Sequence, residues 1–208
     1  MTVLVVSGAV GIAAVLLFGV AAFAMHATRT VVVPTSQLSV VPSAPAAKVL
    51  APTTGRLRAS RAWVTSTSRA TGIGAVAVSA YGTVSLRLAR DRPGCHLGWT
   101  TLAGIGGVES GHGTTGGATL LADGNTSKPI LGPALNGTAG MASIRSDAQS
   151  THWHGDPQWD HAVGPMQFIP STWRTWGADG NGDGVSDPNN MYDSAYATGL
   201  YLCASGAD

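Results

Sequence analysis

The apolar residues of this chain change their spacing several times, and each spacing predicts a different kind of segment. Residues 3–24 are apolar or small throughout and carry no charge. Between residues 72–90 the apolar positions instead recur every three or four residues, which is typical of an amphipathic helix, and a Pro-Gly pair ends it. Trp99, Leu102 and Ile105 resume the same helical spacing. We therefore expect a second helix there.

The remaining predicted helices are shorter, and a long irregular region precedes them. Residues 114–162 are rich in Gly, Pro and Asn and show little periodicity, so we expect loops there. Pro170 is suited to start a short helix that Gly177 ends, and a last helix is expected from Tyr192 to Cys203. The pattern as a whole predicts a mainly α fold.

The chain divides into three predicted parts. Residues 1–25 form a signal peptide or a membrane anchor, because their 22 uncharged positions are long enough to cross a bilayer. Ala22 and Ala24 fit a processing site, whereas no Lys or Arg precedes them, so both alternatives stay open. Residues 26–70, rich in Ala, Pro, Ser and Thr, are expected to be a disordered linker. Residues 71–208 are the expected folded domain.

The charges are distributed unevenly, although the formal net charge is only +1. Nine of the twelve Lys and Arg residues precede Cys95, whereas ten of the eleven acidic residues follow it. The basic residues are scattered among small side chains with few aromatics, which argues against a nucleic-acid partner. We expect instead that the basic part is attracted to an anionic cell wall or membrane surface.

The two cysteines, Cys95 and Cys203, lie at the two ends of the C-terminal half of the chain. In an oxidising compartment they should form a disulfide that closes a loop of about 100 residues, worth about 4 to 5 kcal/mol in the chain-entropy model. Two buried free thiols are the alternative, which an exported chain disfavours.

Glu109 is the only glutamate in the sequence, and it extends the apolar stripe of Trp99 and Leu102 at the end of the predicted helix. Burial there would disfavour the ionised form and raise the pKa, which suits a group that donates a proton near neutral pH. Gly111 is placed to end the helix in the left-handed conformation. A solvated side chain is the alternative, although the helix dipole gives no reason to prefer a carboxylate at this end.

A run of Asp, Asn and Gly from residue 179 follows the ligand spacing of a calcium-binding EF-hand loop. The glutamate that is usual at the last ligand position is absent, because Asn190 stands there, and an aspartate follows three residues later. We expect a structural Ca²⁺ and leave a metal-free turn as the alternative. The expected ligands are Asp179, Asn181, Asp183, Val185 and Asp193.

Two motifs together resemble a known enzyme family. Residues 104–113, Gly-Ile-Gly-Gly-Val-Glu-Ser-Gly-His-Gly, and residues 162–173, Ala-Val-Gly-Pro-Met-Gln-Phe-Ile-Pro-Ser-Thr-Trp, are similar to motifs of peptidoglycan lytic transglycosylases. The resemblance is to the membrane-bound lytic transglycosylase B type in its actinobacterial form, and covers roughly residues 70–208. It implies a lysozyme-like α+β domain with an EF-hand-like calcium loop, and a domain that continues beyond Asp208.

The resemblance also implies a mechanism with one acid. Glu109 would protonate the oxygen between N-acetylmuramic acid and N-acetylglucosamine, and would then take a proton from the muramic C6 hydroxyl to give a 1,6-anhydro product. The residues that the resemblance places at the substrate are Ser110, Met166, Gln167, Phe168 and Tyr201. The implied partner is the peptidoglycan glycan strand, bound by an extracytoplasmic, cell-wall-associated monomer without nucleic acid.

Two other functions stay open at this point. A hydrolytic muramidase on the same scaffold would use water as the nucleophile, and a non-catalytic, calcium-dependent wall-binding module would have no turnover. Glycosidases commonly use two carboxylates. Neither motif offers a second one, since Asp123 and Asp160 lie in predicted loops.

Overall fold

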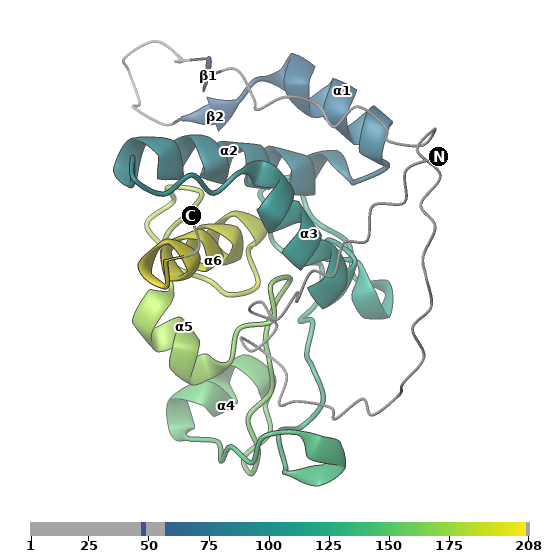
Figure 1. The fold of residues 1–208 in the computed structure, drawn as a ribbon. Coiled ribbons are helices and arrows are strands. Elements are labelled where there is room, and N and C mark those ends of the chain that lie inside the picture. Colours follow the sequence, from purple (N-terminus) through teal and green to yellow (C-terminus); the bar gives the residue numbers. More distant parts are fainter. Residues whose placement is uncertain (1–46, 49–56, 207–208) are drawn as a thin grey trace, which may run out of the picture.

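Helix α2 (Ala75–Asp91) packs against four other elements of the fold. The computed structural model describes residues 47–48 and 57–206, and this part of the chain is mainly helical (Figure 1). The other elements are β1 (Ala47–Lys48), β2 (Arg58–Ala59), α1 (Arg61–Thr71), α3 (Trp99–Ser110), η3 (Thr115–Gly117), η4 (Thr138–Gly140), α4 (Ala148–His154), α5 (Pro170–Trp176) and α6 (Met191–Ala204). The strands β1 and β2 form a two-residue antiparallel pair.

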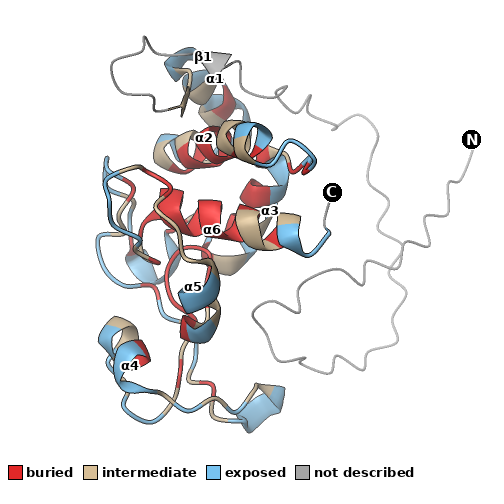
Figure 2. Ribbon diagram, turned by 90° about the vertical axis from the view of Figure 1, so that its left-hand side faces the viewer, coloured by how far each residue is buried: buried red, intermediate tan, exposed pale blue. Residues whose placement is uncertain are grey.

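The core lies between α2 and α6. Ten of the fourteen residues of α6 are buried, and Figure 2 shows this helix as a buried centre with α2 on one side. The two helices approach closely at Gly199, where a Cβ would overlap the side chain of Leu88. Leu88 itself is fully buried, and burying a leucine contributes about 1.5 to 3 kcal/mol. The predicted helices at residues 72–90 and from Tyr192 to Cys203 are confirmed as α2 and α6.

The predicted linker is shorter than expected at its C-terminal end, because residues 58–70 belong to β2 and α1. Ser60 caps α1 by accepting a hydrogen bond from the backbone N–H of Trp63 at 3.2 Å. The ring of Trp63 packs edge-on against Trp99 at 5.3 Å, so α1 is tied to the core. The average composition of residues 26–70 does not reveal the Ser60 cap or the contact of Trp63 with Trp99.

The rest of the predicted linker and the predicted signal or anchor segment lie outside the described residues. Among the residues that the structure describes, no helix combines the length and apolar character needed to cross a membrane.

The region between α3 and α5 is mostly loops, as predicted. It is held by isolated bridges, including those that join Leu131 to Val163 and Val163 to Phe168. Helix α4 within it was not predicted. Asp147 and Ser150 form a reciprocal capping box at its start, which stabilises a helix too short to show a periodic pattern.

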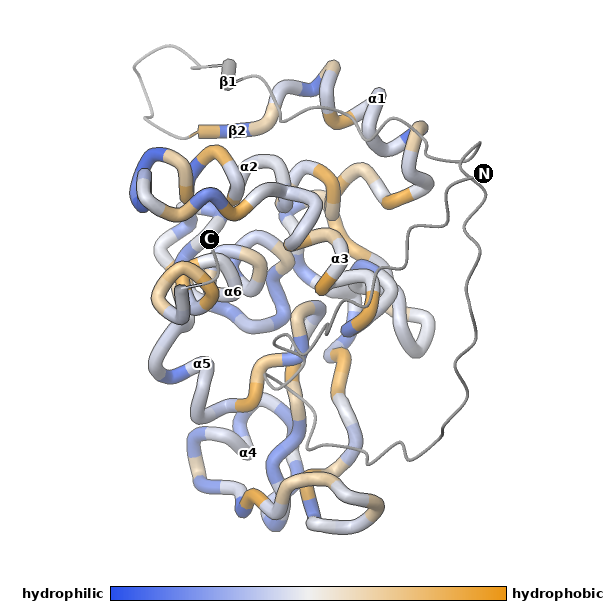
Figure 3. Tube along the Cα trace, in the orientation of Figure 1, coloured by the Kyte–Doolittle hydropathy of each residue, from blue (hydrophilic) through white to orange (hydrophobic). Residues whose placement is uncertain are grey.

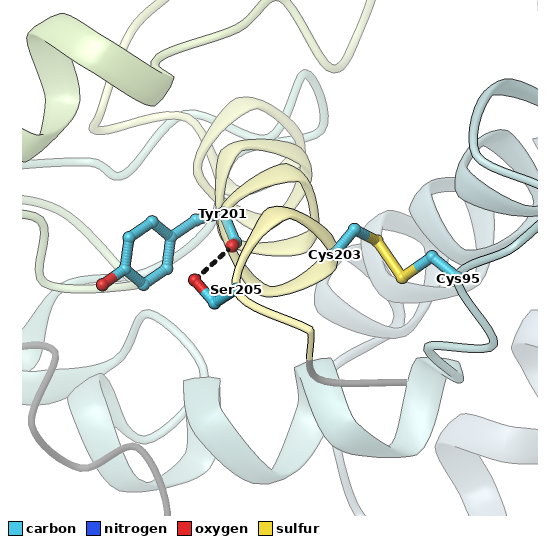
Figure 4. Close-up of a disulfide and its surroundings, with 4 residues drawn as sticks. All are labelled: Cys95, Tyr201, Cys203 and Ser205. Atoms are coloured by element: carbon cyan, nitrogen blue, oxygen red, sulfur yellow. Dashed lines mark hydrogen bonds between the residues drawn. A yellow bond between two sulfur atoms is a disulfide. The ribbon is translucent and has the colours of Figure 1, made fainter.

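The predicted disulfide is confirmed. Cys95, just before α3, is bonded to Cys203 near the end of α6, with Cα atoms 5.5 Å apart (Figure 4). The two cysteines are 108 residues apart in sequence, and the bond joins the segment just before α3 to α6.

Candidate functional site

Helix α3 carries Glu109 close to its C-terminal end. As predicted, the helix ends at Gly111, which has a φ of 56°. The backbone N–H of His112 then donates to the carbonyl of Gly106 at 2.8 Å, so the chain turns sharply after the acid. A fixed helix end therefore holds Glu109 at the start of a turn.

The carboxyl group of Glu109 is partly buried and has no hydrogen-bond partner in the described part of the chain. Its Oε2 atom is shielded from solvent, and no group among the described residues donates to it. Desolvation raises the pKa of Glu109 from 4.5 to about 7. Because no cation or donor of the described residues offsets this burial, the protonated form of the acid is favoured well above the pH at which a free glutamate ionises.

Ser110 connects the acid-bearing helix to the second motif. Its Oγ donates to the carbonyl of Pro165 at 2.6 Å and accepts from the backbone N–H of Gly113 at 2.7 Å. The side chain is buried, and both its donor and an acceptor position are used within the protein. The two motifs, 55 positions apart at this contact, are thus joined directly behind Glu109.

Gln167 lies in a tight loop closed by the bridge between Val163 and Phe168. Its φ of 51° is in the left-handed region, which is uncommon for a residue with a side chain. Its Nε2 donates to the carbonyls of Gly164 at 2.8 Å and Ile130 at 3.3 Å, and no described donor is bonded to its Oε1. The carboxamide is therefore fixed in orientation and keeps its oxygen free as an acceptor.

The neighbours of Gln167 pack into the protein. Met166 is almost completely buried, with its sulfur close to the backbone of Gly106 in α3. Phe168 is also buried, and its ring meets that of Trp173 edge-on at 5.2 Å. In this structure both side chains support the loop that carries Gln167.

Tyr201 lies on α6, and its ring meets that of Trp176 edge-on at 5.5 Å. Figure 4 shows Tyr201 and Cys203 pointing to opposite sides of the helix. A cavity of about 590 Å³ lies beside the disulfide and is lined in part by Trp176 and Cys203. Neither Glu109 nor any of the predicted substrate-binding residues lines this cavity.

The predicted calcium loop is internally hydrogen-bonded. Asp179 accepts from the backbone N–H groups of Gly182 and Gly184, and Asp183 accepts from that of Val185. Asn181 donates its side-chain N–H to Asp183 at 2.8 Å. No group of three His, Cys, Asp or Glu side chains gathers at metal-binding distance among the described residues. The side-chain oxygens of Asp179, Asn181 and Asp183 thus accept hydrogen bonds from backbone or amide N–H groups of the same loop.

Asp193 closes this loop from the first turn of α6. It is 1% exposed, and its two oxygens accept from the backbone N–H groups of Gly180, Asn181 and Asp187. Desolvation is the main cause that raises the pKa of Asp193 to about 6. No Lys, Arg or His in the described part of the chain forms an ion pair with it. Its buried charge is therefore compatible with a nearby cation.

Arginines hold the outer side of the same loop. The guanidinium of Arg87 lies 4.0 Å from the ring centre of Tyr196 and donates to the carbonyl of Asp179 at 2.7 Å, and Arg58 donates to the carbonyl of Asn181. Arg87 belongs to the C-terminal end of α2, a strongly hydrophilic part of the trace in Figure 3. The loop is thereby fixed to the central helix pair.

The sequence analysis did not identify Tyr81 and His112, which pack against α3. The hydroxyl of Tyr81 lies 3.2 Å from Nδ1 of His112, and it fits against α3 only because Gly106 has no side chain. Burial raises the pKa of Tyr81 and lowers that of His112, so both are neutral near pH 7. The glycines of the 104–113 motif were the available signal, since a close approach of another element requires them.

The C-terminal third of the chain is similar to one known family. Residues 144–207 match the family model of the transglycosylase SLT domain. The transglycosylase SLT match spans α4, α5 and α6 with the Gln167 loop, whereas Glu109 lies outside it. No curated protein and no solved structure matches the chain.

A transglycosylase SLT domain indicates a lytic transglycosylase that binds peptidoglycan. The disulfide between Cys95 and Cys203 agrees with this, because such bonds persist in oxidising compartments. Together they indicate an extracytoplasmic protein.

Proposed function

We propose that this chain is a peptidoglycan lytic transglycosylase of the membrane-bound lytic transglycosylase B type, with Glu109 as its single acid and base. The observation that carries the proposal is the buried, unpartnered Oε2 of Glu109 together with a pKa raised to about 7. A group with this pKa exchanges its proton readily near neutral pH, which one residue acting first as acid and then as base requires. The SLT match of residues 144–207 supports the choice of substrate.

In the proposed reaction Glu109 donates its proton to the oxygen that links N-acetylmuramic acid to N-acetylglucosamine, and the bond from that oxygen to C1 breaks. The carboxylate then accepts the proton of the muramic C6 hydroxyl as O6 bonds to C1. This regenerates the protonated acid and yields the 1,6-anhydro ring without consuming water. The free Oε1 of Gln167 would accept a hydrogen bond from a sugar hydroxyl or amide.

The surroundings of the other acids support a mechanism with one carboxyl group. Asp160 is buried and paired with His154 at 3.3 Å, and Asp123 accepts hydrogen bonds from the backbone and side chain of Asn125. A nucleophile supplied by the substrate removes the need for a second carboxylate. The same reasoning disfavours the hydrolytic alternative, in which a base would have to activate water.

Mass spectrometry of peptidoglycan digests tests the proposal. The protein should release products with 1,6-anhydromuramic ends, and the Glu109→Gln variant should release none. Asp123→Asn is the matched control, because it also removes one carboxylate and should leave the product pattern unchanged. Hydrated reducing ends would identify a muramidase instead. Glycan binding by both Glu109 forms without any cleavage would identify a wall-binding module.

We also propose that residues 179–193 hold a structural Ca²⁺ ion. The donor set is all oxygen, which Ca²⁺ prefers, and the buried Asp193 forms no ion pair with a cationic side chain of the described residues. Asp179, Asn181 and Asp183, the carbonyl of Val185, and Asp193 would be its ligands. The ion would fix the loop between the Gln167 segment and α6, on which Tyr201 would contact the glycan.

The proposed setting is the cell wall. Residues 3–24 would act as a membrane anchor or a cleaved signal, and the chain would bind glycan strands as a monomer.

A further inference from the structure

His161 makes two hydrogen bonds that link separate loops of the irregular region. Its Nδ1 lies 2.8 Å from the carbonyl oxygen of Gly132, and its Nε2 lies 3.2 Å from a carboxylate oxygen of Asp156. The side chain of His161 is only 16% exposed. The imidazole is therefore held between two fixed partners, one on either side of the ring.

Both partners of His161 are hydrogen-bond acceptors. A backbone carbonyl can only accept, and an ionised carboxylate can only accept. Hydrogen bonds from backbone N–H groups, that of Gln158 first, and then the bond from His161 lower the pKa of Asp156, which keeps it ionised. A neutral imidazole has one N–H and can satisfy only one of these acceptors. Both contacts can therefore be hydrogen bonds only when the imidazole of His161 carries a proton on each ring nitrogen.

The other titratable groups beside His161 are His154 and Asp160. The ring of His154, from α4, lies 5.0 Å from that of His161 between centroids. Its Nδ1 accepts the backbone N–H of Asp156 at 3.1 Å, and its Nε2 lies 3.3 Å from a carboxylate oxygen of Asp160. The carboxylates of Asp156 and Asp160 thus lie beside the two imidazole rings.

The carbonyl that His161 holds belongs to a segment in contact with Gln167. Gly132 also donates its backbone N–H to the carbonyl of Ala162 at 2.9 Å. A Cβ on Gly132 would lie 2.9 Å from Oε1 of Gln167, and Nε2 of Gln167 donates to Ile130 two residues earlier. Any movement of residues 130–132 therefore changes the contacts that Ile130 and Gly132 make with the Gln167 carboxamide.

We infer that His161 is a positioning residue for Gln167, and that it positions residues 130–132 fully only when its imidazole carries both protons. When His161 loses a proton it must release either Gly132 or Asp156. Residues 130–132, which contact Gln167, then lose part of their support, and glycan binding weakens. The part that concerns glycan rests on the function proposed above; the coupling of His161 to Gln167 does not.

Nuclear magnetic resonance of the free protein tests the coupling without substrate. Over about pH 5 to pH 8.5, the range in which histidines titrate, the imidazole nitrogens of His161 should change from two N–H groups to one. The side-chain NH₂ signals of Gln167 and the amide of Gly132 should shift with the same midpoint. A His161 ring that changes state while the Gln167 signals stay fixed overturns the inference, as does a single N–H at low pH.

Calorimetric binding of a soluble, uncross-linked glycan tetrasaccharide tests the consequence. The Glu109→Gln protein is used, so that neither turnover nor titration of Glu109 contributes. Affinity should fall about two- to tenfold above the His161 midpoint, the range of one net hydrogen bond. His161→Arg keeps a permanent cation with several N–H donors and should bind at all pH values as the parent does at low pH. His161→Gln should bind weakly throughout.

The control is His152→Gln, which alters an exposed histidine of α4 and should reproduce the parent profile. A His161→Arg protein that keeps the parent pH dependence contradicts the inference. Absence of glycan binding by the parent at every pH contradicts the proposed function instead, and the resonance experiment still decides whether His161 positions Gln167.

Discussion

The burial of Glu109 should make the protein less stable at neutral pH than a variant that cannot ionise at this position. In the unfolded chain the carboxyl ionises near its ordinary pKa of 4.5, whereas in the folded protein it ionises at about 7. Between these two values the folded state binds the extra proton. The contribution of Glu109 to the free energy of unfolding is therefore near zero below this window, falls as the pH rises through it, and stays at its full destabilising value above it.

The magnitude follows from the same two pKa values. The difference between 4.5 and about 7 corresponds to about 3 kcal/mol at 1.36 kcal/mol per pH unit. Glu109 is only partly buried, so solvent screening reduces this to about 1 to 2 kcal/mol. Glutamine has nearly the same shape and no charge, so Glu109→Gln should remove this amount of destabilisation above pH 7 and change little near pH 4.

Guanidinium unfolding of both proteins at about pH 4, 5.5, 7 and 8.5 measures the effect, since all other titrating groups cancel in the difference. The advantage of Glu109→Gln should grow from near zero at the lowest pH to its full value at the highest. A difference that does not depend on pH would show that the acid ionises normally and is not desolvated. The proposed catalytic role would then lose its physical basis.

Three further perturbations have defined outcomes. Millimolar calcium should raise the melting temperature relative to chelator in the parent protein but not in Asp193→Asn, and an equal response of both would exclude a site at this loop. Cys203→Ser should lower the free energy of unfolding by about 2 to 5 kcal/mol, whereas reducing agent should destabilise the parent and leave the variant unchanged. Gly106→Ala should lower the free energy of unfolding by about 1 to 3 kcal/mol, because a Cβ there would overlap the Tyr81 hydroxyl. An unchanged free energy of unfolding in denaturant would mean that α3 and α2 can move apart at this contact without cost.

Helix α2 could be predicted because it buries apolar residues that recur every three or four positions, among them Ala77, Val84 and Leu88. Helix α6 is buried at every position from Met191 to Gly199, so burial of one apolar face does not describe it. The ends of α3 and α5 could also be predicted, since Gly111 and Gly177 occupy their cap positions. The disulfide followed from there being two cysteines in an exported chain.

Short elements and side-chain states could not be predicted in this way. Helix α1 depends on the Ser60 cap and on one contact between Trp63 and Trp99, and neither produces a period. The contact between His161 and the carbonyl of Gly132 joins residues that are 29 positions apart in sequence. Contacts between loops set such properties, and a linear pattern does not encode them.

The distribution of satisfied and unsatisfied polar groups separates Glu109 from its neighbours. Ser110 and Gln167 are buried polar residues whose hydrogen bonds to Pro165, Gly164 and Ile130 fix their positions. Glu109 is adjacent to Ser110, yet its shielded oxygen has no partner among the described residues. A protein selected only for stability would pair or expose that oxygen, because an unpaired buried carboxyl is destabilising. A rigid frame around one unpaired acid is the arrangement expected where the missing partner is a substrate atom.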